Sequence, residues 1–173
     1  MTRAILAGIL LCAFASYVSA AATTINVTMT GFKEPSGGDN GGTGNGSFTF
    51  DPDADTISWL LNYSGLQGTS LTGFHIHGPN ATETGNFPVY RGFTITPGQT
   101  PPSGTLTGTL TTADDATLGA KIDTILADPH GFYVNLHTNV FPGGAIRSQL
   151  PEPATMTLLA CGVLGLSIRR KRA

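Results

Sequence analysis

Three histidines are the residues of this chain whose type and spacing could bind a metal ion. His75 and His77 are two positions apart in the segment Gly-Phe-His-Ile-His, and residues two apart on a β-strand point to the same face. Two imidazoles about 7 Å apart along a strand can share one ion. His137 lies in a second strand-like segment and could supply a third nitrogen. These residues predict a mononuclear copper or zinc site, with a polar patch of hydrogen-bonded histidines as the alternative.

A late arginine and a run of aspartates are the other residues that could bind a ligand. Arg147 could bind an anionic group or pair with an acidic neighbour. Asp51, Asp53 and Asp55 have the spacing that opens a calcium loop, but Thr56 stands where that loop needs a glycine, which favours an ordinary turn. No serine lies in a nucleophile elbow. We therefore expect no catalytic residues and keep metal-dependent redox activity as the enzymatic alternative.

Short segments of alternating polarity must position these side chains. Between residues 24 and 32, for example, Ile25, Val27 and Met29 fall on one face, as in a half-buried strand. Residues 37–46 are rich in glycine and asparagine and are expected to form a loop. The predicted strands cover residues 24–32, 47–50, 56–63, 71–77, 87–93, 104–110, 132–138 and 145–150.

One helix is expected before the last two strands. Apolar residues recur at helical spacing at Leu118, Ile122, Ile125 and Leu126. Thr112 and Asp115 have the spacing of a capping box, with aspartate in the place of the usual glutamate. About eight short strands and a single short helix predict a mainly β domain, either an antiparallel β-sandwich or a barrel-like fold.

The N-terminus has the features of a secretory signal peptide over residues 1–21. Arg3 provides the charged start, residues 5–14 are apolar, and Val18-Ser19-Ala20 forms a small-residue cleavage site. These features predict export across the inner membrane by the Sec translocon.

The C-terminus, residues 151–173, reads as a polar motif, a short apolar segment and a basic stop. The motif is Pro151-Glu152-Pro153, the apolar segment covers residues 154–168, and four cations follow it. Lysine and arginine are retained on the cytoplasmic side of a membrane, so a transmembrane segment at 154–168 is expected. It is short against the roughly 20 residues that a spanning helix needs, which suits a transient anchor.

Between these ends lies one domain, residues 22–150. Both cysteines lie outside it, so it has no disulfide and must be stabilised by its core or by a bound ion. It has four lysine and arginine residues against ten aspartate and glutamate residues, a net charge of −6. An acidic domain without a basic cluster argues against nucleic acid as a partner.

The C-terminal tail resembles the PEP-CTERM sorting signal of Gram-negative bacteria. That resemblance implies recognition of Pro151, Glu152 and Pro153 by an exosortase. It also implies transient anchoring in the inner membrane, then placement in the cell envelope, on the outer surface or in an extracellular matrix, with exopolysaccharide as a possible partner.

The central domain resembles the CHRD domain, first named from the animal protein chordin. Two segments carry the resemblance, Gly-Phe-His-Ile-His-Gly-Pro from Gly73 and Phe-Tyr-Val-Asn-Leu-His-Thr from Phe132, followed by Phe-Pro-Gly-Gly-Ala-Ile-Arg-Ser-Gln-Leu from Phe141. The family usually has glutamate where Ala145 stands and glycine where Ser148 stands. Neither departure removes a histidine or Arg147.

The strand with His75 and His77 is also similar to the strand that carries two copper ligands in copper/zinc superoxide dismutases. That family needs six histidines and a zinc-binding aspartate, and this chain has four histidines in all. The fourth, His130, stands in a Pro-His-Gly turn. A bimetallic centre cannot be built from this set.

These observations predict an exported, exosortase-processed CHRD-domain protein with a structural, adhesive or binding role. The alternative is a mononuclear copper or zinc protein centred on His75, His77 and His137.

Overall fold

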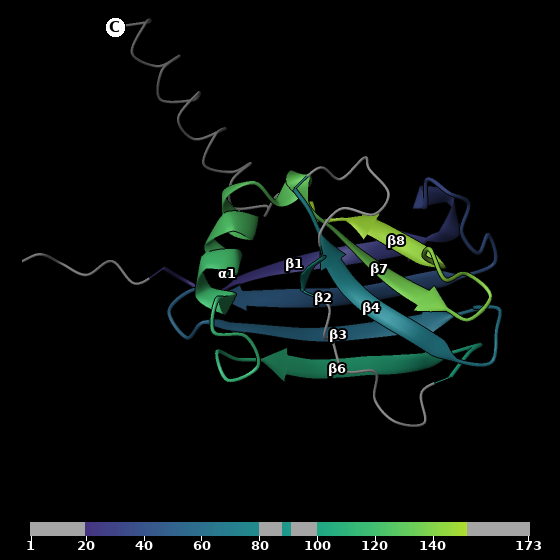
Figure 1. Ribbon diagram of the computed structural model, residues 1–173, viewed down its shortest axis with the longest axis horizontal. Helices are drawn as coiled ribbons and strands as arrows, with labels where there is room; N and C mark the ends of the chain where they lie inside the picture. Colours follow the sequence, from purple (N-terminus) through teal and green to yellow (C-terminus); the bar gives the residue numbers. More distant parts are fainter. Residues whose placement is uncertain (1–19, 80–87, 91–99, 152–173) are drawn as a thin grey trace, which may run out of the picture.

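The computed structural model describes residues 20–79, 88–90 and 100–151 (Figure 1). The described strands are β1 (Thr23–Thr30), β2 (Thr43–Asp51), β3 (Thr56–Ser64), β4 (Leu71–His77), β5 (Pro88–Tyr90), β6 (Gly104–Leu110), β7 (Tyr133–Thr138) and β8 (Ile146–Gln149). The described helices are α1 (Leu118–Ala127) and two 3-10 turns, η1 (Gly31–Lys33) and η2 (Pro129–Gly131).

The strands join in a single antiparallel sheet of order β5-β4-β7-β8-β1-β2-β3-β6. Its two halves meet at β8 and β1, where the register pairs only Thr30 with Arg147. So short a ladder lets the sheet bend sharply, and Figure 1 shows β4, β7 and β8 crossing in front of β1, β2, β3 and β6. The prediction of a mainly β, antiparallel domain with one short helix is confirmed. Of the two predicted forms, sandwich and barrel-like, the curled sheet corresponds to the barrel-like one.

The hydrophobic core fills the space inside the curl. In β1, Ile25, Val27 and Met29 are buried while the residues between them are exposed, as the alternation predicts. α1 covers one end of the strands (Figure 1) and buries Leu118, Ile122 and Ile125. The described core residues all lie between Ile25 and Leu150. This segment therefore has its own core, which is the property of a domain that folds alone.

The expected loop over residues 37–46 is wrong in its second half, because β2 begins at Thr43. Its glycines are strand residues that allow close packing. A Cβ atom on Gly46 would lie 2.2 Å from the Leu60 carbonyl oxygen, and one on Gly44 would lie 2.9 Å from Cδ1 of Ile146. The glycine-rich composition thus reflects close approach of neighbouring groups.

The predicted capping box is also wrong, since α1 begins at Leu118 after Thr117. Asp115 instead accepts hydrogen bonds from Thr117, 2.9 Å from its backbone nitrogen and 2.7 Å from its hydroxyl, and forms an ion pair with Lys121. Thr111 and Asp114 form a separate turn before it. The helix itself and its apolar positions are as predicted.

The first half of the glycine-rich segment is held by a fully buried carboxylate, Asp39. Its oxygens accept hydrogen bonds from the backbone nitrogens of Gly41 at 3.1 Å and Gln67 at 2.5 Å, and from Nε2 of Gln67 at 3.2 Å. Its own backbone nitrogen donates to the Ala145 carbonyl at 2.8 Å. Asp39 therefore ties together three loops that are far apart in the sequence.

Asp51, the first aspartate of the weak calcium pattern, stabilises the turn between β2 and β3. Its Oδ1 accepts hydrogen bonds from the backbone nitrogens of Asp53 at 3.0 Å and Ala54 at 2.9 Å. This is the geometry of an Asx turn, which agrees with the interpretation of the segment as an ordinary turn.

Several predicted segments lie outside the described residues. They are most of the signal peptide, Glu152 and Pro153 of the sorting motif, the apolar segment 154–168, and most of the predicted strand 87–93, of which β5 is the described part. Among the residues that are described, none belongs to a helix long and apolar enough to cross a membrane.

Candidate metal centre

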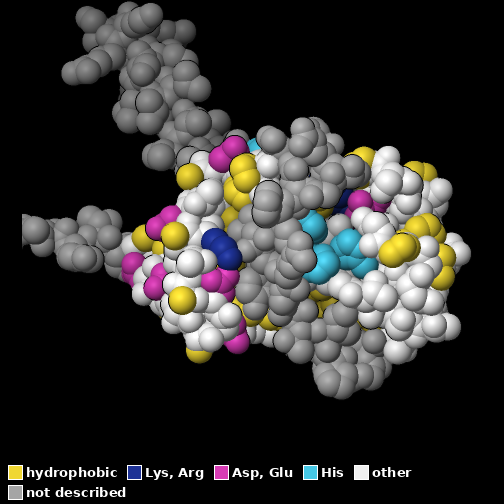
Figure 2. All heavy atoms as spheres, in the orientation of Figure 1, with side chains coloured by type: hydrophobic (Ala, Val, Ile, Leu, Met, Phe, Trp, Pro, Cys, Tyr) yellow, Lys and Arg dark blue, Asp and Glu magenta, His cyan; other side chains and the backbone are white. Residues whose placement is uncertain are grey.

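The three predicted histidines come together on the outer face of β4 and β7. The two strands pair antiparallel with Gly73 opposite His137, His75 opposite Asn135 and His77 opposite Tyr133. Their potential ligand atoms lie within 4.8 Å of one another. Figure 2 shows histidine side chains gathered on this face. The strand period placed His75 and His77 on one face, and the β4–β7 register brings His137 to them.

Gly73 makes room for the cluster. A Cβ atom at this position would lie 2.6 Å from Cε1 and 3.0 Å from Nε2 of His75, and 3.4 Å from Cδ2 of His137. The shortest of these distances lies below those of real Cβ contacts, so a larger residue here would displace the His75 ring. The glycine thus allows the two rings to approach each other across the strands.

Hydrogen bonds fix the tautomer of His137. Its Nδ1 lies 2.9 Å from the carbonyl oxygen of Pro142, and a carbonyl can only accept, so Nδ1 carries the proton. Nε2 of the neutral ring then has a free lone pair, which accepts a hydrogen bond from Nδ1 of His75 at 3.0 Å. Burial lowers the pKa of His137, the Pro142 carbonyl raises it, and His77 lowers it. The ring is therefore held neutral, the form that binds metal.

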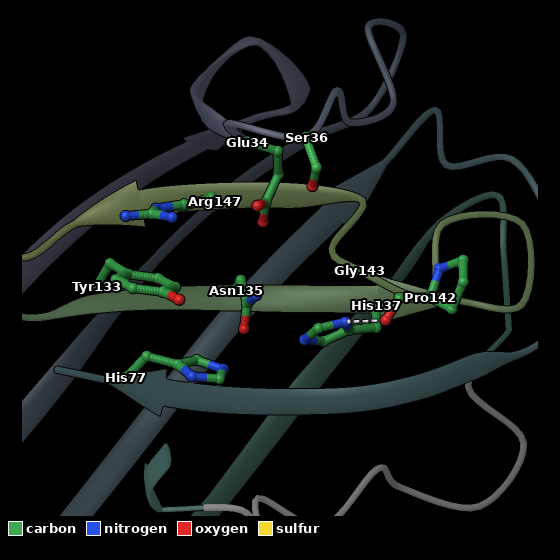
Figure 3. Close-up of a pocket in the computed structure, with 9 residues that line it drawn as sticks. All are labelled: Glu34, Ser36, His77, Tyr133, Asn135, His137, Pro142, Gly143 and Arg147. Atoms are coloured by element: carbon green, nitrogen blue, oxygen red, sulfur yellow. Dashed lines mark hydrogen bonds between the residues drawn. The ribbon is translucent and has the colours of Figure 1, made fainter. Parts of the chain in front are cut away.

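His77 is held in place by a stack of three side chains. Its ring lies parallel to that of Tyr133, with centroids 4.9 Å apart and planes 7° apart. The Arg147 guanidinium lies over the same tyrosine, 3.3 Å from the ring centroid, which is the geometry of a cation–π contact. Figure 3 shows the stack running across β8, β7 and β4. Arg147, predicted as a ligand or ion-pair residue, thus supports a ring next to the cluster.

A pocket of about 410 Å³ opens beside the histidines. Its lining residues come from four parts of the chain and are drawn in Figure 3: Glu34, Ser36, His77, Tyr133, Asn135, His137, Pro142, Gly143 and Arg147. His75 belongs to the cluster but not to this lining. The pocket gives the cluster an open side.

A buried carboxylate, Glu34, faces the middle of this pocket. Its exposed fraction is 6%, and a Cβ atom on Gly144 would lie 2.3 Å from its Oε1, so the loop before β8 is packed closely around it. Burial raises the pKa of the Glu34 carboxyl to about 6, whereas the Arg147 guanidinium and a hydrogen bond from the Asn135 side chain lower it. Glu34 is thus a proton-binding group at mildly acidic pH.

In the metal-free protein, Glu34 should make the domain less stable as the pH rises from 4.5 to about 6. Its pKa is raised from 4.5 in the folded state, so this state binds the proton more tightly than the unfolded chain does. The stabilisation is complete below pH 4.5 and is lost as the pH passes about 6. Since one pKa unit corresponds to about 1.4 kcal/mol, the loss is about 2 kcal/mol at most.

The measurement is the free energy of unfolding against pH for the natural protein and for Glu34→Gln, which should lack this loss. The lowered pKa of His137 acts in the opposite direction, removing stability as the pH falls below 6.5. The two proteins are therefore compared with each other at each pH. Identical pH dependence in both would contradict the role given to Glu34.

Glu34, Tyr133 and Asn135 are among the residues lining this pocket that were not predicted as site residues from the sequence. Tyr133 and Asn135 alternate with His137 along β7, so the same period of two that linked His75 and His77 could have identified them. Glu34 follows η1 and has no local signal that links it to the histidines. His130, in η2, is exposed and lies outside the cluster.

Two protein-family models match this chain. The CHRD domain model matches residues 23–150, and the PEP-CTERM protein-sorting motif matches residues 149–172. No curated protein and no solved structure gives a match. The first match covers the whole described sheet together with every residue of the histidine cluster and its pocket.

Proposed function

This chain belongs to the CHRD domain family and carries a PEP-CTERM sorting motif, which addresses it to exosortase and the Gram-negative cell envelope, and for its exported domain we propose the binding of one copper or zinc ion. The ligands are His75, His77 and His137. The observation that carries the proposal is the convergence of their ligand atoms to within 4.8 Å.

The spacing of the first two nitrogens suits a metal ion. Nitrogens bound at about 2.0–2.1 Å to one tetrahedral zinc ion lie roughly 3.3 Å apart, and Nδ1 of His75 is 3.0 Å from Nε2 of His137. An ion would take the place of the hydrogen that these two atoms share. Its binding would therefore release or move one proton, so the affinity should fall at low pH.

The third ligand needs a small movement. The ring centroid of His77 lies 5.4 Å from that of His75 and 6.5 Å from that of His137. Binding would require a rotation of the imidazole that brings one of its nitrogens closer, and the stack with Tyr133 would limit how far the ring can turn. The Pro142 carbonyl already orients His137 through Nδ1, as outer-shell groups do for histidine ligands.

Imidazole ligands suit both zinc and copper, and copper(II) binds the more tightly of the two at most such sites. We expect the same order here. The structural or adhesive role within a matrix polysaccharide stays a prediction from the sorting signal, and so does the expectation that the protein is not an enzyme.

The test uses residues 22–150, loaded with copper or zinc, dialysed, and analysed for metal per chain. About one equivalent is expected in the natural sequence, and none in a His75→Ala/His77→Ala double variant. His130→Ala is the matched control, because it removes an exposed histidine outside the cluster. No retained metal in the folded natural domain would refute the proposal and leave the histidines as a hydrogen-bonded patch.

A further inference from the structure

Asn135 occupies the centre of the polar face that carries the histidines. It is paired with His75 on β4 and with Arg147 on β8, and it lies two residues before His137 on β7. Directly paired residues on neighbouring strands have Cβ atoms about 4.5–5.5 Å apart, and diagonal neighbours about 7–8 Å. The Asn135 side chain is therefore within reach of the whole cluster.

The amide oxygen of Asn135 accepts no hydrogen bond from the described part of the protein. Asn135 is 2% exposed, and its Oδ1 is buried without a hydrogen-bond partner among the residues that the structure describes. Leaving a buried polar atom unpaired costs about 1–3 kcal/mol, and such an atom in a native fold calls for an explanation. A ligand absent from the structure provides one.

Glu34 determines which end of the amide faces the histidines. A carboxylate accepts hydrogen bonds, so the Asn135 side chain must turn its NH₂ group toward Glu34 to form the hydrogen bond between them. Its oxygen is then left on the opposite side. Figure 3 shows Glu34 on one side of Asn135, and the amide oxygen on the side of His77 and His137.

We infer that Asn135 Oδ1 is the fourth ligand of the metal ion and that Glu34 is the residue that positions it. This inference rests on the proposed metal site. Amide oxygens bind metal ions through a lone pair, and a buried oxygen without a donor is available to do so. Three imidazoles and one amide oxygen make a four-coordinate set of the kind that zinc adopts.

A protein-derived fourth ligand also bears on chemistry. Structural zinc sites have four protein ligands, whereas catalytic ones keep a position open for water. With Asn135 bound, a water molecule from the pocket could bind the ion only as a fifth ligand. The set therefore favours a site that retains its metal over one that activates water.

Cobalt(II) in place of zinc tests the fourth ligand, because its visible absorption is strong in four-coordinate sites and weak when water raises the coordination number. In Asn135→Ala the absorption should fall, and a chelator competition should show zinc binding about 100-fold weaker, the upper end of what loss of a supporting group costs. Glu34→Gln should show a smaller loss of affinity. Asn26→Ala, the same change at an exposed position of β1, should behave as the natural protein.

Asn135→Asp keeps the shape of the side chain and restores an oxygen ligand, so it should recover the absorption and the zinc affinity even if the alanine variant folds poorly. If Asn135→Ala folds and keeps both at the natural level, or if Asn135→Asp folds and recovers neither, Asn135 is not a ligand although the three-histidine site stands. If the natural protein retains no metal, the site itself fails and this inference with it.

Discussion

Zinc at about 1,000 times its dissociation constant should raise the free energy of unfolding of the domain by about 4 kcal/mol, and His137→Ala should abolish that gain. An ion bound only by the folded state stabilises it by mass action, and the three ligands come from strands that are together only in the folded chain. His137 is the ligand whose lone pair is already oriented by the Pro142 carbonyl. The measurement is chemical denaturation with zinc and with a chelator.

His130→Ala is the control for this experiment. It removes one imidazole and leaves intact the backbone carbonyl of residue 130, which accepts a hydrogen bond from Gln149. The stability of the His130→Ala variant should respond to zinc as the stability of the natural protein does. An equal response in His137→Ala would mean that the stabilising ion binds elsewhere.

Asp39→Ala should destabilise the domain by about 3–5 kcal/mol, through loss of a buried acceptor rather than of apolar contact. Three donors, the backbone nitrogens of Gly41 and Gln67 and the side chain of Gln67, end on its two carboxylate oxygens. Each would remain buried or partly buried without a partner, at about 1–3 kcal/mol apiece. The measurement is the midpoint and slope of denaturation in the metal-free domain.

Asp39→Asn distinguishes this explanation from a cavity effect, since the amide has nearly the same volume. It keeps one acceptor oxygen and turns the other into a donor, which faces a backbone N–H group. We therefore expect a loss that is smaller than that of alanine but still above 1 kcal/mol. Asp123→Ala on the exposed face of α1 controls for the lost charge. A neutral Asp39→Ala would contradict the role given to this carboxylate.

The distinction between this site and a copper/zinc superoxide dismutase centre follows from the number of ligands. The described residues bring three histidines together, and the fourth histidine is exposed on η2. The proposed site would hold one ion, with or without Asn135. The similarity of the two histidine strands therefore extends to a single pair of histidines.

Much of the strand pattern could be predicted from the sequence. The bounds of β4 and β6 agree with the prediction to the residue, because both are bounded by turn residues. The errors, in the loop predicted over residues 37–46 and in the capping box predicted at Thr112, came from glycine and threonine residues. Gly44 and Gly46 looked like loop residues, although they are strand residues opposite large side chains. A glycine-rich composition indicates only that the backbone can adopt many conformations. The reason that a position must be glycine can instead be a close neighbour on another strand.

The sequence by itself determined that His75 and His77 share one face, since a strand has a period of two regardless of its surroundings. It also determined the export signals, which are linear motifs. Only the tertiary structure decided that β7 lies beside β4, that Arg147 stacks on Tyr133, and that Glu34 faces Asn135. These neighbours are set by the order of strands in the sheet and by the sharp bend between β8 and β1. Both depend on pairing between segments far apart in the chain, which no local pattern specifies.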